Sequence, residues 1–400
     1  MTVSLRSVDE VVDQILELVQ PSEEYEIRPL DEALNCCASK DLYSPVDVPP
    51  ADNSAMDGYA IAYKEAKLEV NYIVSGRIPA GYVGEKLSSG SVARIFTGAL
   101  IPDGADTVVM QENVSLNQGQ VNLLELPKQF QNIRFKGQDI KKGSLIVRKG
   151  DLLSARTLSL IASVGLAEIE VVTPLKIAIM STGDELVEPG EEITRGQIYS
   201  SNRYVLSGML RNMGMSVIDL GIVADTPKAT QDALLEAASI ADCILSSGGV
   251  SVGEEDHVKI AVEKLGKLSL WKLSIKPGKP LAFGEVLGVP FFGLPGNPVS
   301  TFVTFHIVAR QYLLSMQGFN DCKPFCLTGE SYFSFEGGSR REYLRVQIQN
   351  IDGQTILSKY PDQGSGIMSS VVFADALALV EADQIVRPGD RLTIYPLSLC

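Results

Sequence analysis

Short hydrophobic runs that end in polar, glycine-rich loops recur along residues 175–314. Each run has the length of a buried strand, and amphipathic stretches with helical spacing lie between the runs. The helical stretches are residues 204–212, 227–239, 258–265 and 299–316. Because strands and helices alternate at this interval, the pattern predicts right-handed βαβ units and a mainly parallel sheet.

The chain before this region follows other periodicities. Residues 8–19 space their aliphatic side chains like one face of a helix, residues 25–30 have strand character, and residues 31–34 indicate a second helix. Residues 51–142 consist of short alternating runs separated by Gly, Pro and Asn turns. This change of pattern predicts a β-rich insert.

Two smaller units complete the predicted organisation. Residues 143–173 indicate a strand, a turn and a helix around 155–164, and we expect them to pair with the segment that precedes the insert. One small domain would then be built from two pieces of chain. Beyond Pro324 the pattern returns to alternation, which predicts a small β domain of barrel or sandwich type.

Composition and charge restrict the partners of the protein. The 400 residues are 45% hydrophobic and 21% charged, which is typical of a chain with several buried cores, and we expect three or more domains. With 35 Lys and Arg against 49 Asp and Glu, the net charge is −14, so neither nucleic acid nor an anionic membrane is an expected partner. The acidic N-terminal helix does not resemble a signal peptide, and no apolar run approaches the roughly 20 residues that cross a bilayer. We therefore expect a cytoplasmic protein.

The six cysteines and two histidines indicate little chemistry. The cysteines form no CxxC pair and are too sparse for a disulfide framework, so we expect reduced, structural thiols. Cys322 and Cys326 have a spacing that could hold zinc, but no histidine is near them in sequence, and ordinary burial or a loop position is preferred. Neither histidine lies in a nucleophile motif, so no Ser, His and Asp set for acyl transfer is predicted.

The polar loops of residues 175–314 all follow predicted strands. Because ligands of parallel sheets bind outside the carboxyl ends of the strands, we expect these loops to meet at one edge. Residues 248–253 place glycines and a hydroxyl between a strand and a helix, an arrangement that can bind phosphate. The motif is neither a Walker loop nor a dinucleotide fingerprint, and taken alone a glycine pair at this position is more often a tight turn.

Two further loops are stiffened by proline and glycine. Lys276 and Lys279 flank a Pro-Gly dipeptide that should direct both ammonium groups toward the same edge, where phosphate or another oxyanion would neutralise them. The alternative is a pair of solvated surface lysines. Residues 295–298 form a second rigid loop, which opens a helix with Ser300 in its first turn. Two stiff loops at neighbouring strand ends favour a preorganised site.

Carboxylates lie among these anion-binding loops. They are Asp184, Glu185, Asp225, Glu254, Glu255 and Asp256. Carboxylates beside a phosphate site usually require a cation, and Mg²⁺, bound through one or two carboxylates plus substrate oxygens, fits best. Because three loops carry acids at one edge, we prefer a metal-assisted phosphate site to an acidic rim.

The composition of two stretches of the insert predicts only turns, yet both stretches carry a family resemblance. They are DNSAMDGYA (52–60) and RIFTGA (94–99), and they are followed along the chain by STGDEL (181–186), SSGGVSVG (246–253), KPGKP (276–280) and GLPGNPVS (293–300). In this order the motifs resemble the MoeA family of molybdopterin molybdenumtransferases, which is related to the E domain of gephyrin. The resemblance runs from about Val8 into the last β domain.

The resemblance implies an elongated, multidomain subunit of mixed α/β and β class. Its four parts are a molybdopterin-binding-like sheet domain (1–23 plus 175–324), a two-piece linking domain (24–46 plus 143–174), the β-rich insert (47–142) and a C-terminal β-barrel (325–400). It also implies a homodimer in which the insert of one subunit approaches the sheet domain of the other. The implied substrates are molybdate and adenylylated molybdopterin; the adenylate is cleaved with Mg²⁺ present, and molybdenum is left on the dithiolene sulfurs.

The motifs also imply roles for individual residues. Glu185, Asp225 and Asp256 would hold the cation or order water near the pyrophosphate, and Lys276 and Lys279 would meet anionic oxygens. Asp57 and Thr97 would complete the pocket from the partner subunit. The remaining expected site residues, which bind substrate or shape its loops, are Ser181, Thr182, Gly183, Gly248, Gly249, Ser251, Gly253, Pro295, Pro298, Ser300, Arg134, Asp139, Arg345 and Ser365.

Arg345 and Ser365 match family positions in variable surroundings. Phe135 stands where the family commonly has a basic residue, a departure within the loop that carries Arg134 and Asp139. For Arg345 the alternative is a solvated strand residue.

Two other functions stay open from the sequence. A related sheet domain could serve a nucleotide or pyrophosphate hydrolase, and the gephyrin resemblance allows a non-catalytic scaffold. The intact acids and both lysines favour the enzyme. The expected partners are the molybdopterin adenylyltransferase that supplies the substrate and the apo-molybdoenzymes, or their chaperones, that receive the product.

Overall fold

The computed structural model describes residues 5–249 and 256–397. The chain forms two compact units. The first comprises Met1–Lys40, Lys149–Ser154 and Glu170–Cys400, and the second comprises Asp41–Arg148 and Ala155–Ile169.

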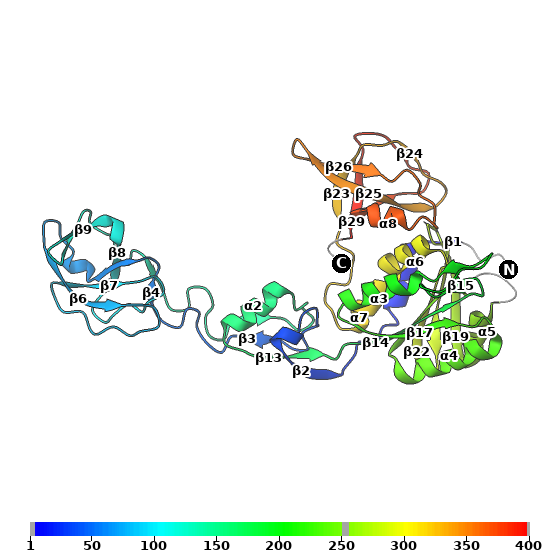
Figure 1. Ribbon diagram of the computed structural model, residues 1–400, viewed down its shortest axis with the longest axis horizontal. Coiled ribbons are helices and arrows are strands. Elements are labelled where there is room, and N and C mark those ends of the chain that lie inside the picture. Colours follow the sequence, from blue (N-terminus) through cyan, green and yellow to red (C-terminus); the bar gives the residue numbers. More distant parts are fainter. Residues whose placement is uncertain (1–4, 250–255, 398–400) are drawn as a thin grey trace. The chain divides into compact units, whose positions relative to one another are not determined.

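The first unit is built around a seven-stranded sheet with the strand order β1-β19-β21-β22-β18-β14-β17 (Figure 1). The strands are β1 (Leu5–Arg6), β14 (Lys176–Thr182), β17 (Ser216–Val223), β18 (Cys243–Ser247), β19 (Gly266–Leu273), β21 (Pro280–Val286) and β22 (Val289–Leu294). Neighbours are parallel except at β21, which is antiparallel to both β19 and β22. The predicted mainly parallel sheet is confirmed, and the carboxyl ends of its parallel strands share one edge.

Helices cover both faces of this sheet (Figure 1). One face packs against α1 (Val8–Leu16), α3 (Asn202–Asn212), α6 (Pro298–Thr304) and α7 (Arg310–Met316), and the other against α4 (Pro227–Ile240) and α5 (His257–Leu265). In β14, Ile177 and Ile179 enter the first core, whereas Ala178 and Met180 enter the second. A strand buried on both faces requires a continuous apolar run, which explains the pattern seen in the sequence.

Two helices of the sheet domain, α4 and α6, begin with a proline. Thr226 accepts a hydrogen bond from the Ala229 N–H, and Pro227 is the first residue of α4. Pro298 likewise opens α6. The predicted helix 299–316 is present but is divided by a π-helical turn, η4 (Phe305–Ala309), between α6 and α7. No helix in the described part of the chain is long and apolar enough to cross a membrane.

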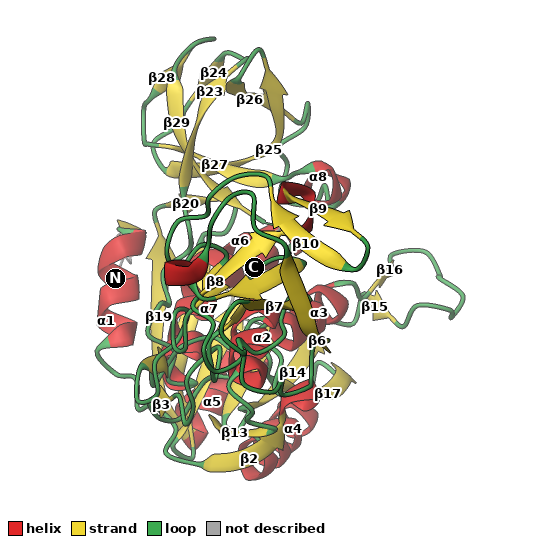
Figure 2. Ribbon diagram, turned by 90° about the vertical axis from the view of Figure 1, so that its left-hand side faces the viewer, coloured by secondary structure: helices red, strands yellow, loops and turns green. Residues whose placement is uncertain are grey.

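A small β-barrel follows the sheet domain in the same unit (Figure 2). Its strands are β23 (Leu327–Ser331), β25 (Arg341–Ile351), β26 (Gln354–Lys359), β27 (Ala376–Val380) and β29 (Arg391–Pro396), with β20 (Ile275–Lys276) added beside β25. The β25–β27 pairing closes the ring around an aliphatic core. The pair β24 (Phe335–Glu336) and β28 (Ile385–Val386) and the helix α8 (Ser369–Phe373) complete it. The predicted C-terminal barrel is confirmed.

The second unit contains a six-stranded sheet with the order β8-β5-β7-β6-β10-β9. The strands are β5 (Gly58–Ile61), β6 (Tyr72–Ile78), β7 (Ser91–Ile95), β8 (Thr107–Met110), β9 (Val114–Asn117) and β10 (Gln120–Leu123), with the one-turn helices η2 (Tyr63–Glu65) and η3 (Gln111–Asn113) and a separate pair of β4 (Asn53–Ser54) with β11 (Ile133–Arg134). Apolar residues pack into two clusters, one on each face. The predicted β-rich character of the insert is confirmed.

Strand pairs join the segments that precede and follow the insert. β2 (Tyr25–Pro29) pairs with β13 (Glu168–Val172), β3 (Leu42–Tyr43) pairs with β12 (Leu145–Val147), and α2 (Ala155–Ser163) lies between β12 and β13 in the sequence. The predicted helix 31–34 is wrong, because only the single 3₁₀ turn η1 (Leu30–Glu32) forms. Asn35 adopts a positive φ of 64° directly afterwards, so the segment is too short to sustain a helix.

Candidate active site

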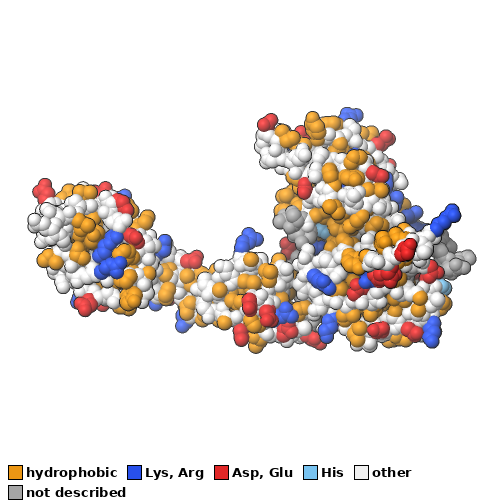
Figure 3. All heavy atoms as spheres, viewed as in Figure 1, with side chains coloured by type: hydrophobic (Ala, Val, Ile, Leu, Met, Phe, Trp, Pro, Cys, Tyr) orange, Lys and Arg blue, Asp and Glu red, His pale blue; other side chains and the backbone are white. Residues whose placement is uncertain are grey.

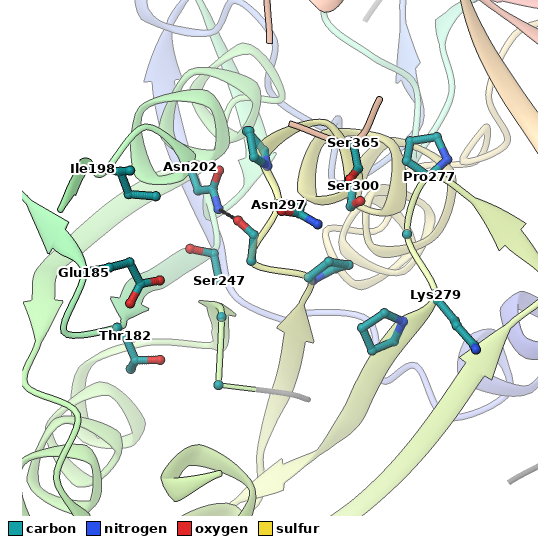
Figure 4. Close-up of a pocket in the computed structure, with 18 of the residues that line it drawn as sticks. Thr182, Glu185, Ile198, Asn202, Ser247, Pro277, Lys279, Asn297, Ser300 and Ser365 are labelled. Atoms are coloured by element: carbon teal, nitrogen blue, oxygen red, sulfur yellow. Dashed lines mark hydrogen bonds between the residues drawn. The ribbon is translucent and has the colours of Figure 1, made fainter. Parts of the chain in front are cut away.

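A cavity of about 780 Å³ lies at the carboxyl edge of the sheet (Figure 4). Its walls are loops that follow β14, β17, β18, β20 and β22, together with a barrel loop between β26 and α8. The expected site residues that line it are Thr182, Gly183, Glu185, Asp225, Gly248, Gly249, Lys276, Lys279, Pro295, Pro298, Ser300 and Ser365. The polar loops that follow separate strands therefore meet at one place.

Ser181 supports this edge without lining the cavity. Its hydroxyl oxygen is 2.7 Å from that of Ser247 in a buried hydrogen bond. The bond joins the carboxyl ends of β14 and β18, which are neighbours in the sheet. Ser181 thus fixes the relative position of two loops rather than presenting a group to a ligand.

The loop after β14 brings a carboxylate close to the backbone. A Cβ atom at Gly183 would lie 2.6 Å from Glu185 Oε2, so the glycine leaves room for the carboxylate (Figure 4). Asp225, which follows β17, lines the same cavity. Two carboxylates from neighbouring strand ends form a donor set of hard oxygens that suits Mg²⁺. In the described residues no three His, Cys, Asp or Glu side chains cluster tightly enough to hold a metal ion, so substrate oxygens would have to complete its coordination.

The two positions after β18 require glycine for steric reasons. Gly248 and Gly249 have φ angles of +91° and +66°, which favour glycine. A Cβ at Gly248 would lie 2.8 Å from the Thr182 carbonyl oxygen, and one at Gly249 would lie 2.4 Å from Val258 Cγ2. The pair therefore lets the loop pack against the neighbouring strand end while its backbone faces the cavity.

The expected continuation of this loop is only partly described. Ser251 and Gly253 lie outside the described residues. Asp256 is the N-cap of α5, where its Oδ1 accepts a hydrogen bond from the Lys259 N–H at 3.0 Å, and its side chain is buried. It does not line the cavity, unlike Glu185 and Asp225.

The two lysines of the KPGKP loop have different surroundings. Lys276 Nζ is 3.1 Å from Oε2 of Glu342, a barrel residue that is only 2% exposed. Lys279 is exposed, and it makes no ion pair with any carboxylate in the described part of the chain. Gly278 between them has a φ of +101° and lies against Thr304. Lys276 is thus anchored to the barrel, whereas the Lys279 ammonium is available to a ligand.

Lys276→Gln is expected to lower the free energy of unfolding by about 1–3 kcal/mol, because the buried Glu342 carboxylate loses its ion pair. Among the described residues it would then keep only the hydrogen bond from the Gly338 N–H, at 3.0 Å. This loss of stability is smaller than the roughly 3–5 kcal/mol that follows when one partner of a fully buried ion pair is removed, because Lys276 is half-exposed. Urea denaturation measures it, with Lys279→Gln as the matched control that should change stability by less than about 0.5 kcal/mol. Adding Glu342→Gln to Lys276→Gln should restore part of the loss; equal stability of wild type and Lys276→Gln would contradict the anchoring role.

The loop before α6 is held by side chains from two elements. Asn202 at the start of α3 donates from Nδ2 to the Gly296 carbonyl at 2.7 Å (Figure 4). Thr301 donates its hydroxyl to the Pro295 carbonyl oxygen. With Pro298 at the first helical position, these bonds fix the loop beside the N-terminus of α6. Ser300 lies in this first turn and lines the cavity.

The barrel supplies the remaining wall. Ser365 lines the cavity, and its carbonyl oxygen accepts a hydrogen bond from the Val299 N–H at 3.0 Å, which ties the barrel loop to α6. Arg340 also lines the cavity and donates from Nη1 to the Ile275 carbonyl at 2.8 Å.

Arg345 is 1% exposed and does not line the cavity, so the alternative of a solvated strand residue is wrong. Its guanidinium donates to Ser370 Oγ at 3.0 Å and to the Gly364 carbonyl at 3.2 Å, and its backbone N–H donates to Gln363 Oε1. Burial lowers the pKa of Arg345 to about 10, which leaves the side chain charged at neutral pH. Arg345 therefore supports the cavity-lining loop 363–365, whereas a direct contact with substrate was expected.

In the second unit, Asp57 and Thr97 form a pair although they are distant in sequence. The Thr97 N–H and hydroxyl both donate to Asp57 Oδ1 at 2.8 Å. These bonds lower the pKa of Asp57 below its usual range, and the bond from the backbone N–H has the larger effect. The two motifs of the insert, 52–60 and 94–99, therefore meet at one place and hold an ionised carboxylate.

Thr97→Ala is expected to raise the pKa of Asp57 part of the way to its usual value, because the hydroxyl is lost and the Thr97 N–H bond stays. A carboxylate with a lowered pKa stabilises the fold above its usual pKa, and that contribution is lost as the pH falls through the lowered value. In Thr97→Ala the loss should occur at a higher pH. An NMR titration of the Asp57 carboxyl carbon measures the shift, with Thr97→Ser as the hydroxyl-bearing control. An unchanged pKa in Thr97→Ala would contradict the pairing.

Arg134 and Asp139 are exposed and belong to the second unit. Arg134 on β11 lies opposite Asn53 on β4, which places it beside the 52–60 motif. The Asp139 backbone N–H donates to the Val48 carbonyl. Neither residue belongs to the walls of the cavity in the first unit.

Three polar residues of the cavity lie outside the motifs quoted from the sequence: Asn202, Arg340 and Gln363. Asn202 stands at the start of a predicted helix, where a polar residue is ordinary. Arg340 and Gln363 come from the barrel, whose loops have no motif of their own. Only the folding of the barrel against the sheet domain brings them to the site.

Three parts of the chain match known sequence families. Residues 6–165 match the MoeA N-terminal region (domain I and II), and residues 178–315 match a probable molybdopterin binding domain. Residues 333–397 match the MoeA C-terminal region (domain IV).

Similar proteins extend over nearly the whole chain. The molybdopterin molybdenumtransferase of Haemophilus influenzae is 38% identical over 98% of both chains. That of a Nostoc species is 32% identical over 99% of this chain and 94% of the relative. A crystal structure of the molybdopterin biosynthesis moeA protein from Pyrococcus horikoshii OT3 has a TM-score of 0.83 at 28% identity and covers 98% of this chain and 100% of that one.

Proposed function

We propose that this chain, which belongs to the MoeA family of molybdopterin molybdenumtransferases, transfers molybdenum from molybdate to molybdopterin that arrives in its adenylylated form. The observation that carries the proposal is the cavity at the sheet edge, where two lysines of one stiff loop and two carboxylates of neighbouring strand ends face a common space. Ammonium groups suit the oxygens of molybdate and phosphate, and carboxylates suit a cation that bridges phosphates.

The reaction balances without an oxidant or reductant. The two dithiolene sulfurs replace one oxygen of molybdate, which leaves with the two thiol protons as water. Cleavage of the phosphoanhydride takes up one water and releases AMP. Molybdenum keeps its oxidation state, so the protein has to hold two anions close together and stabilise the charge that develops on the phosphates.

The residues of the cavity have separate proposed tasks. Lys279, with its free ammonium, binds an anionic oxygen of molybdate or phosphate, and Lys276 adds positive charge from its anchored position. Ser300 and Ser365 offer hydroxyls, and the Gly248–Gly249 backbone lets a phosphate approach closely. The prolines 295 and 298 keep the loop before α6 preorganised.

Mg²⁺ fits the donor set that the cavity presents. Glu185 and Asp225 would hold it, and the bound ion would supply positive charge to polarise the phosphoanhydride. Asp256, which caps α5, would act by fixing the glycine loop or by ordering water.

Glu185→Gln is expected to raise the Mg²⁺ concentration for half-maximal AMP release by about tenfold or more, because an amide is a weaker ligand than a carboxylate. Initial rates across a Mg²⁺ titration measure it. Glu191→Gln, an exposed position in the same loop region that does not line the cavity, is the control of equal charge change. An unchanged Mg²⁺ requirement in Glu185→Gln would remove this residue from the metal site.

The second unit enters the proposal through a partner chain. We propose a homodimer in which Asp57 and Thr97 of one subunit complete the cavity of the other. A molybdopterin adenylyltransferase would supply the substrate, and apo-molybdoenzymes or their chaperones would take the product. The compartment proposed for this biosynthesis is the cytoplasm.

The test uses purified protein with adenylylated molybdopterin, Mg²⁺ and molybdate. AMP is measured by chromatography, and the product is added to a cofactor-free molybdoenzyme. AMP release that requires both molybdate and Mg²⁺, together with an activated molybdoenzyme, is the expected result. AMP release that ignores molybdate would identify a hydrolase, and tight binding without AMP release would identify a scaffold; either result contradicts the proposal.

A further inference from the structure

Two arginines of the second unit share one aromatic ring. Arg77 on β6 and Arg94 on β7 are partners in the parallel register of these strands. Their Cζ atoms lie 4.6 Å and 4.8 Å from the centre of the Phe96 ring. We call Arg77, Phe96 and Arg94 the arginine–phenylalanine cluster. In the described residues neither arginine forms an ion pair, although the protein has a net charge of −14.

The two guanidinium groups differ in how they are held. Arg94 donates to the Gly58 carbonyl at 3.2 Å and to Gln111 Oε1, and it also lies over the Tyr59 ring. The Arg77 guanidinium is exposed and makes no hydrogen bond to any described residue. Arg94 is therefore preorganised, and the N–H donors of Arg77 are available to a ligand.

The arrangement brings two positive charges to one ring. Like charges repel each other, so an anion bound between or beside them would be attracted to both. The Asp57 carboxylate interacts electrostatically with Arg94, and its Oδ1 accepts both hydrogen bonds from Thr97. Figure 3 shows basic side chains bordered by hydrophobic ones on the face of this unit. Arginine guanidinium groups offer both charged N–H donors and a planar surface, which suits a phosphate joined to a flat ring.

We propose that the arginine–phenylalanine cluster binds a phosphate group attached to a planar heteroaromatic ring. The fork of N–H donors on Arg77 binds the phosphate oxygens, and the planar Arg77 guanidinium, which lies on Phe96 and is exposed, provides a flat surface for the heterocycle. Arg94, which lies over both the Tyr59 and the Phe96 rings, adds positive charge. The identity of the ligand rests on the proposed function: adenylylated molybdopterin carries such a group at each end of its diphosphate, the adenylate and the pterin phosphate. The cluster would thus add substrate-positioning residues beside Asp57 and Thr97.

Binding of small probes to the full-length protein tests this without turnover. AMP, 6-hydroxymethylpterin phosphate and inorganic phosphate are titrated by calorimetry in the absence of molybdate and Mg²⁺. The variants are Arg77→Gln, Arg77→Lys and Phe96→Leu. Arg156→Gln, an exposed arginine on α2 in the same unit, is the control of equal charge change. Circular dichroism and melting temperature verify that each variant is folded.

Arg77→Gln is expected to weaken the binding of AMP, of the pterin phosphate or of both by about tenfold or more, while Arg156→Gln stays within about twofold. The affinity of Arg77→Lys for the probes should lie between those of wild type and Arg77→Gln. Lysine keeps the positive charge but lacks the planar set of N–H donors of the guanidinium. The probe whose binding is weakened by Arg77→Gln identifies which end of the substrate the cluster holds. Unchanged affinity for both probes, equal weakening by Arg156→Gln, or no binding of either probe to wild type would overturn the inference.

The two proposals fail separately. If Arg77→Gln binds both probes like wild type while molybdate-dependent AMP release is present, the cluster inference is wrong and the proposed function stands. If wild type binds AMP through Arg77 but its AMP release ignores molybdate, the proposed function is wrong and the cluster stands.

Discussion

Lys279→Gln is expected to reduce molybdate-dependent AMP release by about 10²–10³-fold, the usual effect of removing one preorganised group that stabilises developing negative charge. Lys279 lines the cavity, is exposed, and pairs with no carboxylate of the described residues, so its charge is not needed for the fold. Single-turnover kinetics with saturating substrate measure the change. Because no buried partner is left behind, thermal stability should be close to that of wild type.

The matched control for this prediction is Lys267→Gln. Lys267 is the second residue of β19, at the opposite end of the sheet, and its ion pair with Glu285 is exposed. The variant loses the same charge far from the cavity and should keep its turnover. A rate for Lys279→Gln within threefold of wild type, or an equal loss in both variants, would exclude a specific role for Lys279.

Gly278→Ala is expected to abolish most turnover, by about 10²-fold or more, and to lower stability by about 1–3 kcal/mol. Gly278 has a φ of +101°, and a Cβ there would lie 2.4 Å from Thr304 Oγ1. Because Thr304 is fully buried in α6, the loop has to move instead, and both flanking lysines move with it. Turnover assays and urea denaturation of the same preparation measure the two effects.

Gly288→Ala separates backbone strain from the steric contact. Gly288 has a similar φ of +88°, but a Cβ there would meet nothing within 4 Å. It should lose about 1–2 kcal/mol of stability from the positive φ alone and keep its turnover. If Gly278→Ala and Gly288→Ala behave alike, the contact with Thr304 does not position the lysine loop.

Periodicity predicted the sheet domain because each element follows a local rule. The helix 227–239 was bounded by Pro227 and by the start of an apolar run, and α4 begins at that proline. The strands were visible because burial on both faces requires continuous apolar residues, as in β14. The loops could be placed at one edge because parallel strands share their direction.

The candidate site was only partly predictable, because its contacts join distant segments. Lys276 and Glu342 are paired through the docking of the barrel, and no local pattern indicates this ion pair. The Asp57–Thr97 hydrogen bonds likewise depend on the pairing of β5 with β7. The family resemblance implies a role for Arg345, but sequence could not show that its guanidinium is buried and bonded to the loop that lines the cavity.

Asp256 illustrates a different limit. A carboxylate in an acidic loop suggests a metal ligand, yet the same residue type is preferred as a helix N-cap. The structure uses Asp256 as the cap of α5, whereas Glu185 and Asp225 line the cavity. Sequence spacing alone does not separate these roles, because both place an acid between a strand and a helix.

The stoichiometry of a single turnover tests the central claim most directly. Purified protein is loaded with adenylylated molybdopterin and Mg²⁺, molybdate is added, and released AMP and molybdenum bound to the pterin product are quantified together. The account predicts one AMP for each molybdenum atom transferred and almost no AMP when molybdate is omitted. AMP released at the same rate without molybdate, or molybdenum transferred without AMP, would contradict it.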